Sequence, residues 1–246
     1  MRLIQITDLH HGLPGEKTRD IDVRRQLANI ITAIQAIPCD AYILTGDFCF
    51  MAPHTDIYLE LRSLLNNLPQ PYFLIPGNHD DPRMMFKVWN NPGQNKVHYY
   101  SFSWPSLTCL FLDTSPGSIS PRQYRWLEEQ LNQLISPVII FSHHPLSTCG
   151  VPYMDERYAL AGQQKIMALL QRCGKDVHVF CGHYHVDKTV SSNRITHYLT
   201  PSVFVQFHPE SKDGVVFHSR PGYRIIEVEE GIVSTYTVYQ DTMMLP

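Results

Sequence analysis

Residues 72–81 read YFLIPGNHDD and join an apolar run to a polar loop. Tyr72–Ile75 is short, apolar and rich in β-forming residues, which is typical of a buried strand. The loop that follows, Gly77-Asn78-His79-Asp80, places three polar side chains directly after a glycine. By itself this loop predicts either a hydrogen-bonded turn, in which Asn78 tolerates a left-handed conformation, or a ligand site at the end of a strand.

The pairing of a buried strand with a polar loop recurs along the chain. Strand-like runs are Arg2–Thr7, Ala41–Thr45, Tyr72–Ile75, Leu107–Leu112, Val138–Ser142 and Val177–Cys181. Besides Tyr72–Ile75, four of these runs are followed or ended by polar loops. These loops are Asp8-Leu9-His10, Gly46-Asp47, His143-His144-Pro145 and Gly182-His183-Tyr184-His185. Each loop alone is a weak signal, because a turn or a solvated histidine also explains it. Gly182-His183-Tyr184-His185 is the strongest, since its alternate histidines point the same way and could bind neighbouring metals. Since ligands of open α/β sheets bind outside the carboxyl ends of strands, the joint pattern predicts one shared site.

Segments of helical periodicity separate these strands. Apolar residues recur at three- and four-residue steps over residues 23–37 and 57–68. A further helix is expected over Gln163–Cys173 and should end at Gly174. Ser120-Pro121-Arg122-Gln123 predicts a capping box. The buried face of the helix it opens is expected to carry Tyr124, Leu127, Leu131, Leu134 and Ile135. Further strands are expected at Ile195–Leu199, Ser202–Gln206, Val215–His218, Tyr223–Val228 and Ile232–Tyr239. The order of elements predicts an α/β fold of the α+β type, with two sheets packed face to face, helices outside, and residues 1–246 in a single domain.

Composition narrows the class of protein. The chain has 246 residues, of which 43% are apolar, and its net charge of −3 counts against a nucleic-acid partner. Its longest uncharged apolar run, Pro137–Phe141, is too short to cross a membrane, and the strand-like start argues against a cleavable signal peptide. Six cysteines without C-x-x-C spacing favour a reduced, cytoplasmic chain. Thirteen histidines favour metal or acid–base chemistry.

The polar loops supply more donors than one metal ion needs. The nitrogen and oxygen donors are Asp8, His10, Asp47, Asn78, His143, His183 and His185. Zinc usually takes about four ligands, so seven donors with one shared carboxylate suit two ions. Donors of this kind, without thiolates, suit Zn, Mn or Fe. Two such ions would form a clamp for attack of water at phosphorus.

Together the five loops resemble the complete signature of the calcineurin-like metallophosphoesterases, and they span residues 8–185. The resemblance implies a four-layer αββα sandwich and a binuclear centre with a hydroxide between the metals. It implies that one metal is held by Asp8, His10, Asp47 and His185, and the other by Asp47, Asn78, His143 and His183. Asp47 would then bridge the ions, and with Asn78 and His79 it would form the catalytic and substrate-binding set. His79, which stands outside the ligand count, would contact the phosphate and assist the leaving group.

Within that superfamily the sequence is similar to bacterial class III cyclic-nucleotide phosphodiesterases and glycerophosphodiesterases. The supporting stretches include Gly15-Glu16-Lys17, Leu112-Asp113-Thr114-Ser115 and Pro221-Gly222-Tyr223-Arg224. The resemblance predicts hydrolysis of small soluble phosphodiesters such as cyclic AMP or glycerophosphodiesters. A broad phosphomonoesterase and a non-catalytic scaffold of the same fold are the alternatives, and a homodimer or higher homo-oligomer stays open.

The sequence leaves the residues around the substrate open. Candidates for the pocket wall are Phe48, His54, Asp81, Arg83, His144, Arg157 and His208. Arg83 and Arg157 could each clamp a phosphate or form a surface salt bridge. His11 directly follows the first metal motif and could contact the substrate or lie solvated in its loop.

Overall fold

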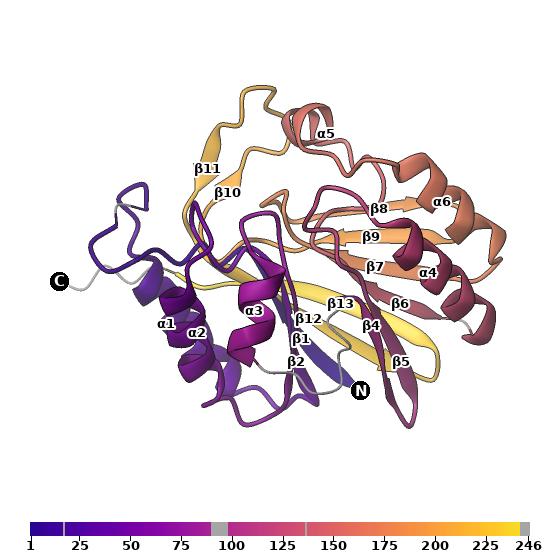
Figure 1. Ribbon diagram of the computed structural model, residues 1–246, viewed down its shortest axis with the longest axis horizontal. Coiled ribbons are helices and arrows are strands. Elements are labelled where there is room, and N and C mark those ends of the chain that lie inside the picture. The colour runs from indigo at the N-terminus through magenta and orange to yellow at the C-terminus, as the bar shows by residue number, and fades with distance from the viewer. Residues whose placement is uncertain (17, 90–97, 136, 242–246) are drawn as a thin grey trace.

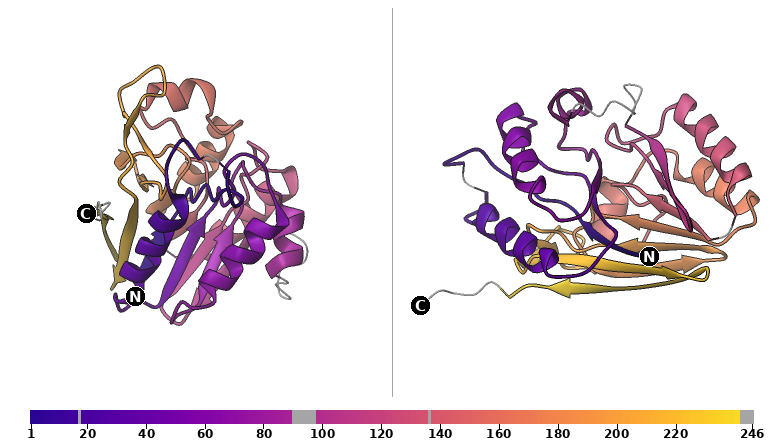
Figure 2. Two further views of the ribbon diagram at one scale, coloured as in Figure 1. Left: turned by 90° about the vertical axis from the view of Figure 1, so that its left-hand side faces the viewer. Right: turned by 90° about the horizontal axis from the view of Figure 1, so that it is seen from below.

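Two mixed β-sheets lie face to face, with helices on both outer sides (Figure 1, Figure 2). The structure is a computed structural model that describes residues 1–16, 18–89, 98–135 and 137–241. In spatial order, the first sheet contains β13 (Ile232–Tyr239), β12 (Gly222–Glu229), β1 (Arg2–Ile6), β2 (Ala41–Thr45) and β3 (Tyr72–Ile75). The second contains β4 (Tyr100–Trp104), β5 (Leu107–Phe111), β6 (Val138–Phe141), β7 (Val177–Cys181), β9 (Ile195–Leu199) and β8 (Lys188–Ser192). A separate ribbon pairs β10 (Gln206–Phe207) with β11 (Val216–His218). The layers confirm the predicted αββα sandwich.

The helices cover the sheets because each has one apolar face. The first sheet is covered by α1 (Val23–Gln35), α2 (Thr55–Leu65) and α3 (Pro82–Trp89). The second is covered by α4 (Pro121–Gln133) and α6 (Gln163–Arg172), while α5 (Pro152–Arg157) lies near the β10–β11 ribbon. Within α1, Leu27 and Ile30 are fully buried and pack in one cluster with Tyr42 of β2. Among the described residues, no helix is long and apolar enough to cross a membrane.

A row of stacked rings crosses the second sheet on the face that meets the first. Phe111, Phe141 and Phe180 lie on adjacent strands with ring centroids 5.3 and 5.6 Å apart. Tyr100 stacks on Phe111 at 4.5 Å, and Tyr198 stacks on Phe180 at 4.7 Å. Such cross-strand pairs stabilise a sheet and fix its register. The row therefore helps to fix the register of the strands in the second sheet.

Three sequence predictions differ from the structure. Ile135 is 85% exposed, because α4 ends at Gln133 and the chain leaves the sheet there. Ser120 does cap α4, but the Gln123 side chain bonds both backbone groups of Asp113 and so joins the helix to the loop after β5. The predicted strand Ser202–Gln206 is mostly a loop, in which Gln206 Oε1 accepts from the Ser202 N–H at 3.0 Å.

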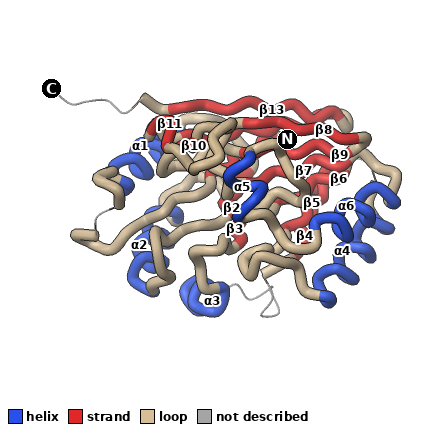
Figure 3. The backbone as a smooth tube through the Cα atoms, turned by 90° about the horizontal axis from the view of Figure 1, so that it is seen from above, coloured by secondary structure: helices blue, strands red, loops and turns tan. Residues whose placement is uncertain are grey.

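The parallel strands bring their carboxyl ends to one edge. β1, β2 and β3 are parallel neighbours in the first sheet, and β5, β6 and β7 are parallel neighbours in the second. Figure 3 looks onto this edge and shows loops and α5 over the strand ends, between the outer helical layers. The polar loops predicted from the sequence follow five of these strands, so the fold gathers them in one place.

Candidate metal centre

The loops at the strand ends bring all of the predicted donors together. Three overlapping groups of carboxylate and imidazole atoms each lie within 4.8 Å of one another. The groups are Asp8–His10–His185, His10–Asp47–His79 and Asp47–His143–His183. Asn78 joins the third group, because its Oδ1 lies 3.1 Å from His143 Nε2. Residues that are up to 177 positions apart in the chain thus form one cluster, as the sequence predicted.

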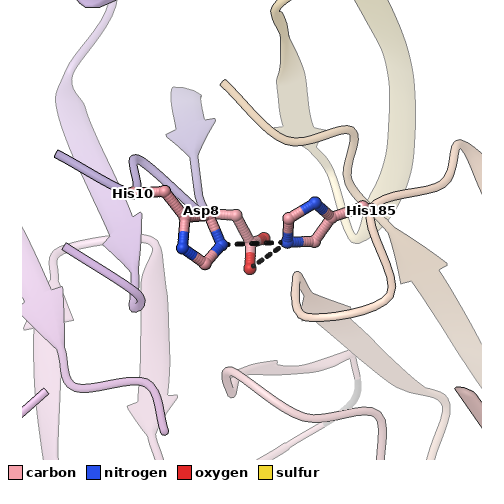
Figure 4. Close-up of side chains that lie close together, drawn as sticks. All are labelled: Asp8, His10 and His185. Atoms are coloured by element: carbon pink, nitrogen blue, oxygen red, sulfur yellow. Dashed lines mark hydrogen bonds and ion pairs between the residues drawn. The ribbon is translucent and has the colours of Figure 1, made fainter. Parts of the chain in front are cut away.

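Asp8, His10 and His185 form one end of the cluster (Figure 4). The Nε2 atoms of His10 and His185 lie 3.1 Å apart, and His185 Nε2 lies 3.2 Å from Asp8 Oδ1. Asp8 is fully buried, and both oxygens of its carboxylate accept from the backbone N–H of His183. Two imidazole nitrogens and a carboxylate that converge in this way fit the ligand sphere of a transition metal.

Asp47 lies between this end and the other. Its Oδ2 atom is 3.7 Å from His10 Nε2 and 3.3 Å from His143 Nε2. Its Oδ1 atom accepts from the backbone N–H of His79 at 2.8 Å. A single carboxylate therefore contacts residues of both ends of the cluster.

Backbone carbonyls orient three of the histidines. The Nδ1 atom of His143 donates to the Thr45 carbonyl at 2.7 Å, and Nδ1 of His185 donates to the Val205 carbonyl at 2.9 Å. His183 uses Nε2 to donate to the Tyr158 carbonyl at 3.0 Å. In a neutral ring, a nitrogen that donates leaves the other nitrogen with a free lone pair, and metal-binding histidines are usually held in this way.

The backbone is strained where the donors lie. Five of them have a left-handed φ, between 45° and 64°: Asp8, His10, Asp47, His183 and His185. This region costs a non-glycine residue of the order of 1 kcal/mol or more, and such strain concentrates at functional sites. From the sequence, left-handed geometry is considered only at Asn78, which does not adopt it, so the strain at the donors themselves is a finding of the structure.

Two glycines let the carboxylates approach the backbone. A Cβ atom at Gly77 would overlap Asp47 Oδ1, and one at Gly182 would overlap Asp8 Oδ2. Asp80, the last residue of the quoted motif, accepts from the Gly77 N–H at 2.8 Å and from the Phe48 N–H at 3.1 Å. It therefore holds the loops after β2 and β3 against each other.

Charge in the cluster suits a cation. Burial opposes ionisation of Asp8, but His185 and other histidines outweigh it and lower the pKa of Asp8 to about 2. Burial lowers the pKa of His10 to about 4 and that of His183 to about 3, so both rings are neutral at pH 7. For His143, Asp47 outweighs the effect of burial and raises the pKa to about 9. Ionised carboxylates beside neutral imidazoles are the protonation states that a metal requires, and a metal would displace the proton from His143.

The pocket above the cluster has a wall that the sequence analysis missed. His79, with a side chain 30% exposed, lines it together with donors of the cluster. The other lining residues are Arg19, Phe50, Met51, Tyr153, Met154, Tyr158, Phe204, Val205 and Phe207. These aromatic side chains come from the loops after β2 and β9, from α5 and its end, and from β10. No spacing rule marks them in the sequence, where they resemble core residues.

The residues proposed for the wall lie elsewhere. Phe48 is in the core, His54 caps α2 through Nδ1, and His144 bonds Thr114. Asp81 and Arg83 line a separate hollow at the start of α3. Arg157 lies over the ring of Tyr153 at 5.2 Å, and His208 packs against Phe217.

His11 has neither of the roles expected for it. It is 2% exposed, and its Nε2 atom lies 3.0 Å from Glu60 and 3.1 Å from Arg24. It therefore ties the loop after β1 to α1 and α2 instead of contacting substrate or solvent.

Comparisons with known proteins agree with this geometry. Residues 1–187 match the model of the calcineurin-like phosphoesterase family. A probable cyclic nucleotide phosphodiesterase of Fibrobacter succinogenes is 31% identical over 246 residues, which cover 98% of this chain and 95% of the relative. A glycerophosphodiester phosphodiesterase of Enterobacter lignolyticus is 30% identical over 200 residues, which cover 75% of this chain and 71% of the relative. The crystal structure of a dimetal phosphatase from Danio rerio has the same fold, with a TM-score of 0.71 and 14% sequence identity. The match covers 96% of this chain and 95% of the phosphatase chain. The chain therefore belongs to the calcineurin-like phosphoesterase family.

Proposed function

We propose that this protein is a metal-dependent phosphodiesterase that hydrolyses small phosphodiesters. The observation that carries the proposal is the convergence of seven nitrogen and oxygen donors, with Asp47 at their centre, at the floor of an open pocket. A scaffold that had lost catalysis would have no need to keep this cluster under backbone strain. The names of the relatives in two phosphodiesterase groups support the same reaction class.

We propose that the cluster holds two ions. Asp8, His10, Asp47 and His185 would bind one ion, and Asp47, Asn78, His143 and His183 the other. The contacts of Asp47 with both ends of the cluster support its role as the shared ligand. The absence of thiolates among these donors favours Zn, Mn or Fe. When bound, two such ions supply Lewis acidity for attack of water at phosphorus and neutralise charge on the phosphate oxygens.

We propose that His79 is the catalytic acid. Its Nε2 atom lies 4.0 Å from Asp47 Oδ2, so the ring stands beside the cluster, and neither of the two ligand sets proposed above requires it. Its partial exposure in the pocket lets it reach a bound phosphodiester. From there it can donate a proton to the departing oxygen, while Asn78 in the same loop contacts metal and phosphate.

The pocket wall favours a substrate with a planar substituent. Phe50 and Phe204 form one aromatic pair at 5.5 Å, and Tyr153 and Tyr158 form another at the same centroid distance. Arg19 at the rim adds a positive charge. Aromatic side chains stack on bases, each stack contributing about 1–3 kcal/mol. We therefore favour a cyclic nucleotide over a glycerophosphodiester.

The test compares four substrates with protein loaded with Mn²⁺ or Zn²⁺. Bis(4-nitrophenyl) phosphate should turn over faster than 4-nitrophenyl phosphate, and 3′,5′-cyclic AMP should have a higher kcat/KM than glycerophosphocholine. Faster turnover of the monoester would favour the phosphomonoesterase. No turnover of any of the four substrates with any metal would favour the non-catalytic scaffold.

A cytoplasmic location and a homo-oligomeric state stay predictions. The cytoplasmic location agrees with the six free cysteines in the described part of the chain.

A further inference from the structure

A line of buried polar side chains crosses the space between the two sheets. Gln5, Thr45 and Thr200 are fully buried, and Arg224 is 2% exposed. They come from β1, β2, the loop after β9, and β12. Buried polar groups are costly unless each finds a partner, so the partners of this line show what it is built to hold.

Each member of the line bonds the next. Arg224 Nε donates to Thr200 Oγ1 at 3.0 Å, and Thr200 Oγ1 donates to Gln5 Oε1 at 2.6 Å. Gln5 Nε2 then donates to Thr45 Oγ1 at 2.9 Å. The side-chain amide of Gln5 thus accepts from Thr200, which follows a strand of the second sheet. It donates to Thr45 on the neighbouring strand of the first sheet.

Both ends of the line reach the loops that carry the metal donors. At one end, the Thr45 carbonyl accepts from His143 Nδ1 at 2.7 Å. At the other end, Arg224 Nη2 donates to Asp187 Oδ1 at 3.1 Å, two residues after His185. The arginine also donates to the Leu199 carbonyl at 3.0 Å, so this side chain of the first sheet is held by two groups on the side of the second sheet.

We propose that Gln5 and Thr200, anchored by Arg224, are positioning residues of the metal centre. They hold Thr45 in the one place where its carbonyl fixes the Nδ1–H tautomer and the ring angle of His143. This inference rests on the proposed role of His143 as a ligand.

The geometry at His143 shows why a small shift matters. Its Nε2 atom lies 3.1 Å from Asn78 Oδ1 and 3.3 Å from Asp47 Oδ2, so this nitrogen faces the shared donors, and its lone pair would point at them once a metal displaces the proton. Rotation of the ring would remove that lone pair from the cluster. Loss of a group that orients a metal-binding histidine typically costs about 10–100-fold in metal affinity. Since the line acts through Thr45, we expect about 10-fold.

The test uses Gln5→Leu and Thr45→Val in the full chain, with Gln26→Leu as the matched control. Gln26 is also a buried glutamine, but it bonds the Ser219 carbonyl, which lies outside the line. Thr45→Ser keeps the hydroxyl group and should restore the wild-type behaviour. Zn²⁺ titration of the stripped protein measures affinity. ¹⁵N shifts of the histidine rings, recorded without metal at a pH above the His143 pKa of about 9, report the tautomer of that ring.

We expect Gln5→Leu and Thr45→Val to weaken one of the two Zn²⁺ sites about 10-fold and to mix the His143 tautomers. Gln26→Leu and Thr45→Ser should change neither. Equal loss of affinity in Gln26→Leu would make the line a stabilising feature only and would overturn the proposal. So would a wild-type tautomer and affinity in folded Gln5→Leu and Thr45→Val. Failure of the wild-type protein to bind Zn²⁺ would instead refute the proposed metal centre, and the tautomer measurement separates these cases.

Discussion

Replacing His79 by alanine separates leaving-group assistance from metal binding. The Nε2 atom of His79 lies 4.0 Å from Asp47 Oδ2, whereas its backbone N–H donates to Asp47 Oδ1 at 2.8 Å. His79→Ala removes the ring and keeps the backbone contact. We therefore expect the variant to retain its metal content.

The size of the loss should depend on the leaving group. A positioned acid contributes about 10²–10⁴-fold in rate, which corresponds to about 3–5 kcal/mol in the activation barrier. For 3′,5′-cyclic AMP the departing oxygen is an alkoxide that needs a proton, so His79→Ala should lose that full amount. For bis(4-nitrophenyl) phosphate the departing nitrophenolate needs little protonation, and the loss should be much smaller.

The assay is kcat for both substrates in the wild type and in His79→Ala, with metal content measured on the same samples. His208→Ala is the control, because His208 packs against Phe217 and does not line the pocket. An equal loss of kcat on both substrates would refute leaving-group assistance and would assign His79 to phosphate binding. Loss of a metal would mean that His79 is itself a ligand.

Three further predictions concern the loop, the wall and the core. Gly77→Ala should abolish metal binding, because the alanine Cβ would overlap Asp47 Oδ1. Metal analysis of the folded variant checks this, and full metal content would contradict the prediction. Tyr153→Ala should raise KM for cyclic AMP about 10-fold and leave KM for glycerophosphocholine unchanged, as loss of one stacking contact predicts; an equal change for both would argue against the aromatic wall. Burial lowers the pKa of His197 to about 4, whereas in the unfolded chain the pKa keeps its ordinary value of 6.5. As the pH falls below 6.5, the unfolded chain binds a proton that the folded protein does not bind, and the folded protein loses stability. Urea unfolding at pH 7 and pH 5 should show the wild type losing about 2 kcal/mol more than His197→Gln, and equal losses would contradict this origin.

Much of the fold could be predicted because hydrophobic runs and glycines mark it locally. Tyr72–Ile75 is apolar throughout, and Gly77 beyond it leaves room for the Asp47 carboxylate. The same logic found the strands before Asp8, Asp47 and His183. Ser202–Gln206 failed because its apolar residues serve a loop that presents Phe204 to the pocket, and apolar content alone does not separate such a loop from a strand.

The metal donors could be predicted from sequence, but the substrate wall could not. Donors such as His183 and His185 are chemically distinctive and follow strands at fixed places. Phe50, Tyr153 and Phe207 come from distant segments, and an aromatic residue in sequence is explained equally well by the core. Charged neighbours were equally hidden: His11 meets Glu60 of α2 only because the helix packs beside the first loop.

The shared role of Asp47 is the central claim, and one measurement tests it most directly. Wild type and Asp47→Ala are loaded with Zn²⁺, freed of excess metal and analysed for bound ions per chain, with hydrolysis of bis(4-nitrophenyl) phosphate followed on the same samples. We expect about two ions per chain in the wild type. In the variant, which loses a donor from both ends of the cluster, we expect fewer than one ion and no measurable turnover. Two ions and wild-type turnover in folded Asp47→Ala would contradict the account.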